Sequence, residues 1–148
     1  MIQQHLHASL VDYRSRGILL IGASGSGKSD LALRLIECGG LLVSDDQVLL
    51  RHQNDRLMGY PPQILRGLLE VRGVGIVTLP HHEYFPVDVV IELVTEPSYD
   101  RLPEPQTLMF LEHKVPKFQF WAFETSVVEK IGLVLSQRLE NQYMLVRK

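Results

Sequence analysis

The stretch Gly22-Ala-Ser-Gly-Ser-Gly-Lys-Ser29 decides how this chain is organised. It follows the apolar run Ile-Leu-Leu-Ile at 18–21 and leads into residues 30–38, where apolar side chains recur at helical spacing. It matches the phosphate-loop pattern G-x-x-x-x-G-K-[ST] at each constrained position, namely Gly22, Gly27, Lys28 and Ser29. An ordinary glycine-rich turn between a strand and a helix is the alternative. Because strand, loop and helix follow in the order that the motif needs, the sequence predicts a site for a phosphoryl group.

Each residue type in this loop has a physical role in binding phosphate. Glycines allow successive backbone N–H groups to point into one concavity, and the N-terminus of the following helix adds partial positive charge. Lys28 can reach the β- and γ-phosphates of a nucleotide, and the Ser29 hydroxyl can ligate Mg²⁺. The residues predicted to contact the nucleotide are Gly22, Ala23, Ser24, Gly25, Ser26, Gly27, Lys28 and Ser29.

Composition limits the class of protein. The 148 residues fit one domain, residues 1–148, with 45% hydrophobic residues and a formal net charge of −2. This balance gives no basic surplus for nucleic acid or for an anionic membrane surface. No apolar run has the length of a membrane span, and the N-terminus lacks the pattern of a signal peptide. We therefore expect a cytoplasmic globular protein whose single cysteine, Cys38, is a core residue.

Strands are expected to outnumber helices. Apolar patterns predict further strands at 5–12, 41–43, 47–52, 56–60, 87–94, 108–111 and 115–121. Helical spacing predicts helices at 28–38, where Gly39-Gly40 can end the helix, and at 124–138. Residues 63–69 are expected to form a short helical turn or loop, and 69–77 a loop or strand. The expected fold is α/β, with the phosphate loop on a mixed sheet.

A pair of carboxylates forms a second candidate group. Asp45 and Asp46 follow the predicted strand 41–43, at the end of a strand where open α/β sheets place their ligands. Adjacent side chains on an extended segment point in opposite directions, so the two should have different roles. One could accept the proton of an attacking hydroxyl, and the other could help to hold Mg²⁺. A turn or a solvated acidic pair is the alternative.

Glu70, Arg72 and His7 are the third group of candidates. On a strand, residues 70 and 72 face the same side, as a metal-binding carboxylate and a phosphate-binding guanidinium would need. An exposed ion pair between them is the alternative. His7 could serve the same pocket if its strand lies beside the phosphate-loop strand.

These features, taken in order, resemble the catalytic domain of the HPr kinase/phosphorylase family. The resemblance rests on His7, GASGSGKSD at 22–30, LLVSDDQV at 41–48, LMGYPP at 57–62 and LLEVRGVGI at 68–76. It covers roughly residues 5–80 and implies a fold similar to that of phosphoenolpyruvate carboxykinase.

The resemblance also implies a role for each candidate. Asp45 would be the base that takes the proton from the acceptor serine, and Lys28 would steady the transferring phosphate. The group around Mg²⁺ would be Ser29, Asp46 and Glu70. His7 and Arg72 would complete the catalytic site.

The implied activity is an ATP- and Mg²⁺-dependent serine protein kinase that phosphorylates an HPr-like phosphocarrier of the bacterial phosphotransferase system. The family also implies a homo-oligomer, a hexamer. Three departures from the family are expected: the chain is expected to lack the family's separate N-terminal domain, Asp30 stands where glutamate is usual, and residues 114–124 replace a basic loop. That loop is tied to docking and dephosphorylation, so we expect weak or absent phosphorylase activity. Lys114, Lys117, Phe118, Phe120 and Trp121 are the candidates for carrier docking.

Two other functions fit parts of the pattern. A nucleotide-sensing regulator would bind ATP without efficient transfer, and it would not need a base such as Asp45. A small-molecule kinase of the phosphate-loop type would need a lid segment rich in arginine, which is not apparent here. The joint presence of Lys28, Ser29, the acidic pair, Glu70 and Arg72 favours the protein kinase.

Overall fold

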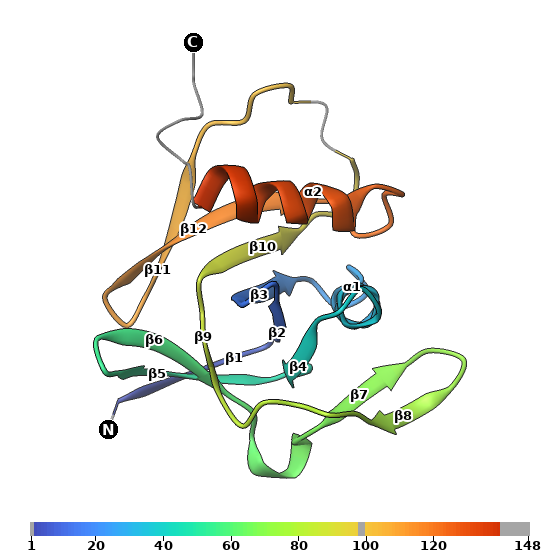
Figure 1. The fold of residues 1–148 in the computed structure, drawn as a ribbon, viewed down its shortest axis with the longest axis vertical. Helices are drawn as coiled ribbons and strands as arrows, with labels where there is room; N and C mark the ends of the chain where they lie inside the picture. The colour runs from blue at the N-terminus through green and yellow to red at the C-terminus, as the bar shows by residue number, and fades with distance from the viewer. Residues whose placement is uncertain (1, 98–99, 140–148) are drawn as a thin grey trace.

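The computed structural model describes residues 2–97 and 100–139. Its central element is a six-stranded sheet with the strand order β11-β12-β10-β3-β2-β4 (Figure 1). The strands, in that order, are β11 (Gln106–Phe110), β12 (His113–Phe120), β10 (Val89–Leu93), β3 (Arg16–Gly22), β2 (Ser9–Tyr13) and β4 (Leu41–Ser44).

The sheet is mixed, as the sequence predicts, and its parallel strands determine where a ligand can bind. Strand β10 pairs in parallel with both β3 and β12. Strand β2 is antiparallel to β3 and to β4, so β4 runs in the same direction as β3. The carboxyl ends of β3, β4, β10 and β12 therefore meet at one edge of the sheet. In open α/β sheets this edge is the usual place for a ligand.

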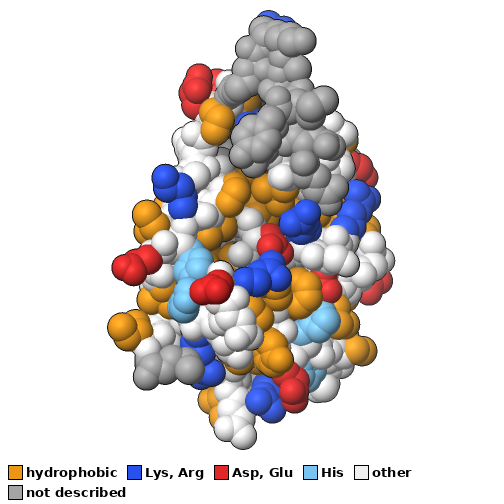
Figure 2. Space-filling view, turned by 60° about the vertical axis from the view of Figure 1, so that its left-hand side comes forward, with side chains coloured by type: hydrophobic (Ala, Val, Ile, Leu, Met, Phe, Trp, Pro, Cys, Tyr) orange, Lys and Arg blue, Asp and Glu red, His pale blue; other side chains and the backbone are white. Residues whose placement is uncertain are grey.

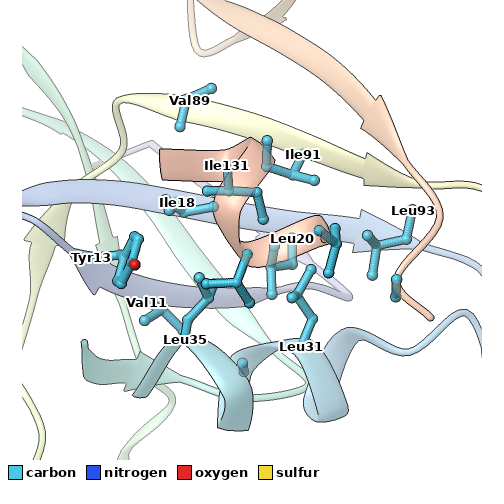
Figure 3. Close-up of a cluster of buried hydrophobic side chains, with 14 of the residues drawn as sticks. Val11, Tyr13, Ile18, Leu20, Leu31, Leu35, Val89, Ile91, Leu93 and Ile131 are labelled. Carbon is cyan, nitrogen blue, oxygen red and sulfur yellow. The ribbon is translucent and has the colours of Figure 1, made fainter. Parts of the chain in front are cut away.

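Two helical segments cover one face of this sheet. Helix α1 (Lys28–Glu37) directly follows the phosphate loop, and α2 (Val127–Leu133) continues into the π-helical segment η2 (Val134–Leu139). Inward-facing side chains of α1 and α2 pack against those of β2, β3 and β10, as Figure 3 shows for Leu31, Leu35 and Ile131. Period-2 alternation along the strands puts Ile18, Leu20 and their neighbours on this face.

A smaller, four-stranded sheet covers the opposite face. Its order is β1-β5-β6-β9, with β1 (Gln3–Leu6), β5 (Val48–Gln53), β6 (Arg56–Tyr60) and β9 (Phe85–Pro86). The alternate residues of the central strands, including Leu10, Leu19 and Val90, form a second core with Val48 and Leu50. Most of the large side chains in these two cores belong to a strand or helix that the apolar patterns indicate; Tyr13 lies one residue beyond the predicted strand 5–12.

The predicted single strand at 5–12 is wrong, because the chain changes sheets within it. Strand β1 ends at Leu6 and pairs with β5, whereas β2 begins at Ser9 and pairs with β3. The bend at His7 and Ala8 joins the two layers. An alternating pattern shows which face of a strand is buried, but not to which sheet the strand belongs.

The remaining elements follow the predictions with small changes. The segment 63–71 forms the short helix η1 (Gln63–Leu65) and strand β7 (Leu68–Val71), which pairs with β8 (Gly75–Thr78) as a separate hairpin. Figure 1 shows this hairpin projecting beside α1. The helix predicted over 124–138 begins at Val127, and its apolar face is buried as expected. Residues 98–99 of the predicted loop 96–106 lie outside the described residues.

Two findings bear on the expected class of protein. Cys38 is exposed at the C-cap of α1, so its prediction as a core residue is wrong; the helix ends there and turns its side chain outward. Among the helices formed by the described residues, none is long and apolar enough to cross a membrane.

Candidate active site

A large pocket lies at the edge of the sheet where the parallel strands end. The phosphate loop follows β3, and the acidic pair follows β4. The pocket has a volume of about 810 Å³. Its lining residues are His7, Gly22, Ser24, Gly25, Gly27, Lys28, Ser29, Asp30, Leu33, Asp46, Glu70, Val71, Arg72 and Phe123. The structure therefore brings together all three groups of candidates, although Ala23, Ser26 and Asp45 are not in the lining.

The phosphate loop has the backbone that the motif requires. Gly25 and Gly27 have φ values of 83° and 100°, in the left-handed region that favours glycine. The Leu31 N–H donates to the Gly27 carbonyl at 2.9 Å, so the first turn of α1 begins at the loop. The Lys28 ammonium donates to the carbonyls of Gly22 at 2.7 Å and Ala23 at 3.2 Å. These bonds hold the lysine side chain along the loop, where a bound phosphate would lie.

Asp45 is buried beneath the pocket and has a full set of partners. Its Oδ1 accepts hydrogen bonds from Ser9 Oγ at 2.7 Å and Ser29 Oγ at 2.9 Å. Its Oδ2 lies 3.0 Å from Ser29 Oγ and accepts from the Glu70 N–H at 3.3 Å. The side chain is only 5% exposed. Asp45 therefore ties the phosphate-loop serine to β2 and β7, and an acceptor hydroxyl in the pocket cannot reach it without displacing these bonds.

Asp46 is exposed and lines the pocket. Its φ is 72°, a left-handed conformation that costs about 1 kcal/mol for a residue other than glycine. The backbone on both sides of it is fixed, because Ala8 N–H donates to the Asp46 carbonyl at 3.2 Å and Asp46 N–H donates to Ser9 Oγ at 3.3 Å. Unusual backbone of this kind is concentrated at functional sites. Here this backbone directs the two adjacent carboxylates to different sides, Asp45 toward the core and Asp46 into the pocket.

Glu70, Arg72 and His7 enter the same pocket from two directions. Glu70 lies on β7, and Arg72 follows at the turn of the hairpin; both are exposed. His7 comes from the bend between β1 and β2. Residues 70 and 72 both line the pocket, but Arg72 lies in the hairpin turn and not on a strand with Glu70, as the prediction required. The site thus combines three basic side chains, His7, Lys28 and Arg72, with three exposed carboxylates, Asp30, Asp46 and Glu70.

The oxygen donors suit a magnesium ion that is shared with a phosphate. Ser29, Asp46 and Glu70 line the pocket, and the buried Asp45 carboxylate accepts a hydrogen bond from Ser29 Oγ. Among the described residues, no three His, Cys, Asp or Glu side chains are grouped closely enough to hold a metal ion by themselves. Mg²⁺ usually keeps several waters and binds through one or two carboxylates plus substrate phosphates. These residues therefore fit Mg²⁺ that arrives with a nucleotide.

The sequence did not point to Ser9, Leu33 or Phe123 as parts of this site. Ser9 supports the acidic pair, Leu33 lies one turn along α1, and Phe123 follows β12. Only the order of strands in the sheet could have indicated Phe123, because it places the carboxyl ends of β3 and β12 at the same edge. For Ser9, the only signal was a polar residue at a buried position of a strand.

Several of the residues predicted to dock a carrier protein are engaged in contacts within the fold. Phe118 and Phe120 pack against the core under α2, and Lys117 forms an ion pair with Glu92 at 2.9 Å. Hydrogen bonds from Gln119 and Lys117 lower the pKa of Glu92 below its usual value. Phe118 and Phe120 are half-buried because β12 lies inside the sheet and its alternate residues face α2. Figure 2 shows Lys and Arg interspersed with acidic and hydrophobic side chains on the face that it draws.

Comparisons with known proteins agree with this architecture. The family described as HPr Serine kinase C-terminal domain matches residues 1–131. The HPr kinase/phosphorylase of Thermoanaerobacter sp. (strain X514) is 40% identical over 124 residues, which cover 76% of this chain and 41% of that protein. That of Shouchella clausii (strain KSM-K16) is 51% identical over 75 residues, covering 50% of this chain and 24% of that protein. This chain thus spans about two fifths or less of these relatives.

A solved structure shares the fold over nearly the whole chain. The Hpr(Ser) kinase/phosphatase from Coxiella burnetii superposes with a TM-score of 0.81 at 28% sequence identity. The match covers 95% of this chain and 94% of that one. The mixed sheet, the phosphate loop at its edge and the family match over residues 1–131 show that the chain belongs to the HPr kinase C-terminal domain family.

Proposed function

We propose that this chain is an ATP- and Mg²⁺-dependent protein kinase that phosphorylates a serine of an HPr-like phosphocarrier in the bacterial cytoplasm. One observation carries the proposal: a phosphate loop and an exposed carboxylate, Asp46, line the same pocket. A pocket of about 810 Å³ is large enough for a nucleoside triphosphate together with a side chain of an acceptor. The acceptor class is taken from the family and from the names of the relatives.

Phosphoryl transfer needs positioning and charge stabilisation more than covalent chemistry. Backbone N–H groups of the phosphate loop and Lys28 hold the β- and γ-phosphates. Arg72 and His7 lie on the pocket wall, where a guanidinium and an imidazole can stabilise the equatorial oxygens of the transferring group. Ser29 and the neighbouring carboxylates would hold Mg²⁺, which would supply positive charge to neutralise the phosphates.

The contacts favour an exchange of the two roles that the family resemblance implies for the acidic pair. Asp45 is buried against Ser29, as a carboxylate that supports a metal-binding serine would be. Asp46 is exposed in the pocket and free to meet an acceptor hydroxyl. The serine oxygen forms a bond to the γ-phosphorus while the bond from that phosphorus to the β–γ bridging oxygen breaks. The hydroxyl proton passes to Asp46, and ADP leaves.

A nucleotide sensor is the second candidate. It would use the same phosphate loop, but it would have no use for the strained backbone that turns Asp46 into the pocket. Weak or absent phosphorolysis and a homo-oligomeric state are further proposals. The first is tested by adding phosphate and phosphorylated carrier, and the second by light scattering during size-exclusion chromatography.

The test of the kinase is transfer of label from γ-labelled ATP to candidate carriers. The protein is incubated with Mg²⁺ and an HPr-like carrier, in parallel with a carrier whose acceptor serine is replaced by alanine. We expect label on the first carrier only, in a form stable to acid as phosphoserine is. ATP binding without label on any carrier would support the sensor.

A further inference from the structure

An aromatic pair lies at the edge of the pocket and has no role in the mechanism above. Trp121 and Phe123 come directly after β12, and their rings meet edge to face with centroids 6.2 Å apart. Phe123 lines the pocket and is 53% exposed. A ligand that covered this exposed phenyl ring would gain hydrophobic free energy. The position of the ring indicates which part of a substrate would cover it.

The phenyl ring lies directly against the phosphate loop. A Cβ atom built on Gly27 would be 3.1 Å from Phe123 Cζ and 2.8 Å from Ala122 Cβ. The absence of a side chain at Gly27 therefore allows the segment 121–123 to approach the backbone at the start of α1. If the phosphates of a nucleotide bind this loop, its ribose and base must lie against a residue beside the loop. Phe123 is such a residue, because it lies next to Gly27.

The segment is held in place rather than mobile. The Arg34 guanidinium of α1 donates to the Ala122 carbonyl at 2.7 Å, and Ala122 is fully buried. The Glu124 N–H donates to the Trp121 carbonyl at 3.2 Å, which closes a turn. These contacts fix the backbone that presents Phe123, so the ring is preorganised for a ligand.

The order of strands decides which end of a nucleotide would face the ring. The phosphate loop follows β3, the acidic pair follows β4, and the aromatic pair follows β12. Strands β4 and β12 lie on opposite sides of β3 in the sheet. The carboxylates and Ser29 mark the end that holds the γ-phosphate and the acceptor. The opposite side, where Phe123 lies, is left for the base.

We propose that Phe123, braced by Trp121, is the stacking surface for the base of the nucleotide whose phosphates bind the phosphate loop. The inference rests on the proposed nucleotide site and adds the group that distinguishes a nucleotide from inorganic phosphates. Stacking uses the π-face that every base has, so it tolerates different bases. ATP and GTP are therefore expected to gain similarly from the ring.

The test compares ATP with inorganic tripolyphosphate, each with Mg²⁺, by calorimetry on the whole chain. Removing a stacking aromatic weakens binding by about 5- to 150-fold per base. Phe123→Ala should weaken ATP binding by about that factor and leave tripolyphosphate binding unchanged, and Phe123→Tyr should restore ATP binding. Tyr84→Ala is the matched control, because Tyr84 is 48% exposed and is not in the pocket lining.

Trp121 supplies an independent signal, since it is the only tryptophan in the sequence. ATP should change its fluorescence in the wild type, and tripolyphosphate should change it much less. Equal losses of ATP and tripolyphosphate affinity in Phe123→Ala would overturn the stacking role and leave the phosphate site intact. Unchanged ATP affinity with a raised KM for the carrier would reassign the ring to acceptor docking. If the wild type binds neither compound, the proposed nucleotide site itself fails.

Discussion

Replacing each aspartate of the acidic pair by asparagine should affect different properties of the protein. Asp45 accepts hydrogen bonds from Ser9, Ser29 and the Glu70 N–H while almost completely buried. In Asp45→Asn one acceptor oxygen becomes a donor, so at least one of these groups loses its partner. Hydrogen bonds to charged groups contribute about 1.5–3 kcal/mol each. We expect Asp45→Asn to lower the free energy of unfolding by about 2 kcal/mol.

Asp46→Asn should leave stability nearly unchanged. The side chain is exposed, and asparagine tolerates the left-handed backbone at this position as well as aspartate does. Transfer should nevertheless fall by about 10²–10⁴-fold, because the amide cannot accept the proton of the acceptor hydroxyl. Since kinase transition states are loose and the proton moves late, the lower part of this range is expected.

Thermal unfolding and single-time-point transfer assays on both variants separate these effects. A loss of about 2 kcal/mol corresponds to a fall in Tm of roughly 4–8 °C for a chain of this size. The expected pattern is a lowered Tm for Asp45→Asn and an unchanged Tm with lost transfer for Asp46→Asn. A lowered Tm for Asp46→Asn, together with an unchanged Tm for Asp45→Asn, would contradict this assignment of roles. Full transfer by Asp46→Asn would show that another group accepts the proton.

Three further predictions concern the loop and the sheet. Lys28→Ala should abolish nucleotide-dependent transfer with little change in Tm, because its hydrogen bonds in the structure go to loop carbonyls; normal turnover would mean that another site does the work. Gly27→Ala should lower the free energy of unfolding in urea by about 1–3 kcal/mol, because the new methyl group would meet Ala122. Gly25→Ala is the control: no atom of the described residues beyond its chain neighbours lies within 4 Å of its new methyl group, so it measures the backbone strain alone. Glu92, whose pKa is lowered by its hydrogen bonds, stabilises the fold above its unfolded pKa of about 4.5, and this contribution disappears as the pH falls through its folded value. Glu92→Gln should therefore lose less stability than the wild type when unfolding is followed below about pH 4.5, and an equal loss would contradict the shift.

Local patterns were sufficient for the phosphate loop and the main elements. The loop is a continuous motif whose glycines and lysine have fixed positions, so its geometry depends little on the rest of the chain. The place of the acidic pair also followed from the sequence, because a strand that ends at Ser44 delivers the next residues to the ligand edge of a parallel sheet.

The division of labour between Asp45 and Asp46 could not be predicted from these patterns. Alternation along a strand says that the two side chains diverge, but tertiary contacts decide which one enters the core. Here Ser9 on β2 and the Glu70 N–H on β7 provide the buried partners. Both lie far from Asp45 in the sequence.

Local sequence patterns also could not predict the long-range contacts of the C-terminal half. Phe118 and Phe120 are aromatic and look suitable for docking, yet they face α2 because β12 is an inner strand of the sheet. Phe123, three residues beyond the end of that strand, reaches the phosphate loop instead. Which aromatic residues are buried and which are presented depends on strand order, and a single sequence does not contain that order in any local pattern.

A single-turnover experiment tests the central claim most directly. Excess protein is mixed with γ-labelled ATP and Mg²⁺, then with an HPr-like carrier, and the label is followed over time in ATP, inorganic phosphate and carrier. We expect the label to move to a serine of the carrier, Lys28→Ala to stop this movement, and Asp46→Asn to slow it without releasing the bound nucleotide. Label that stays in bound ATP would contradict transfer and favour a sensor, and label released as inorganic phosphate would show that water, not a protein serine, is the acceptor.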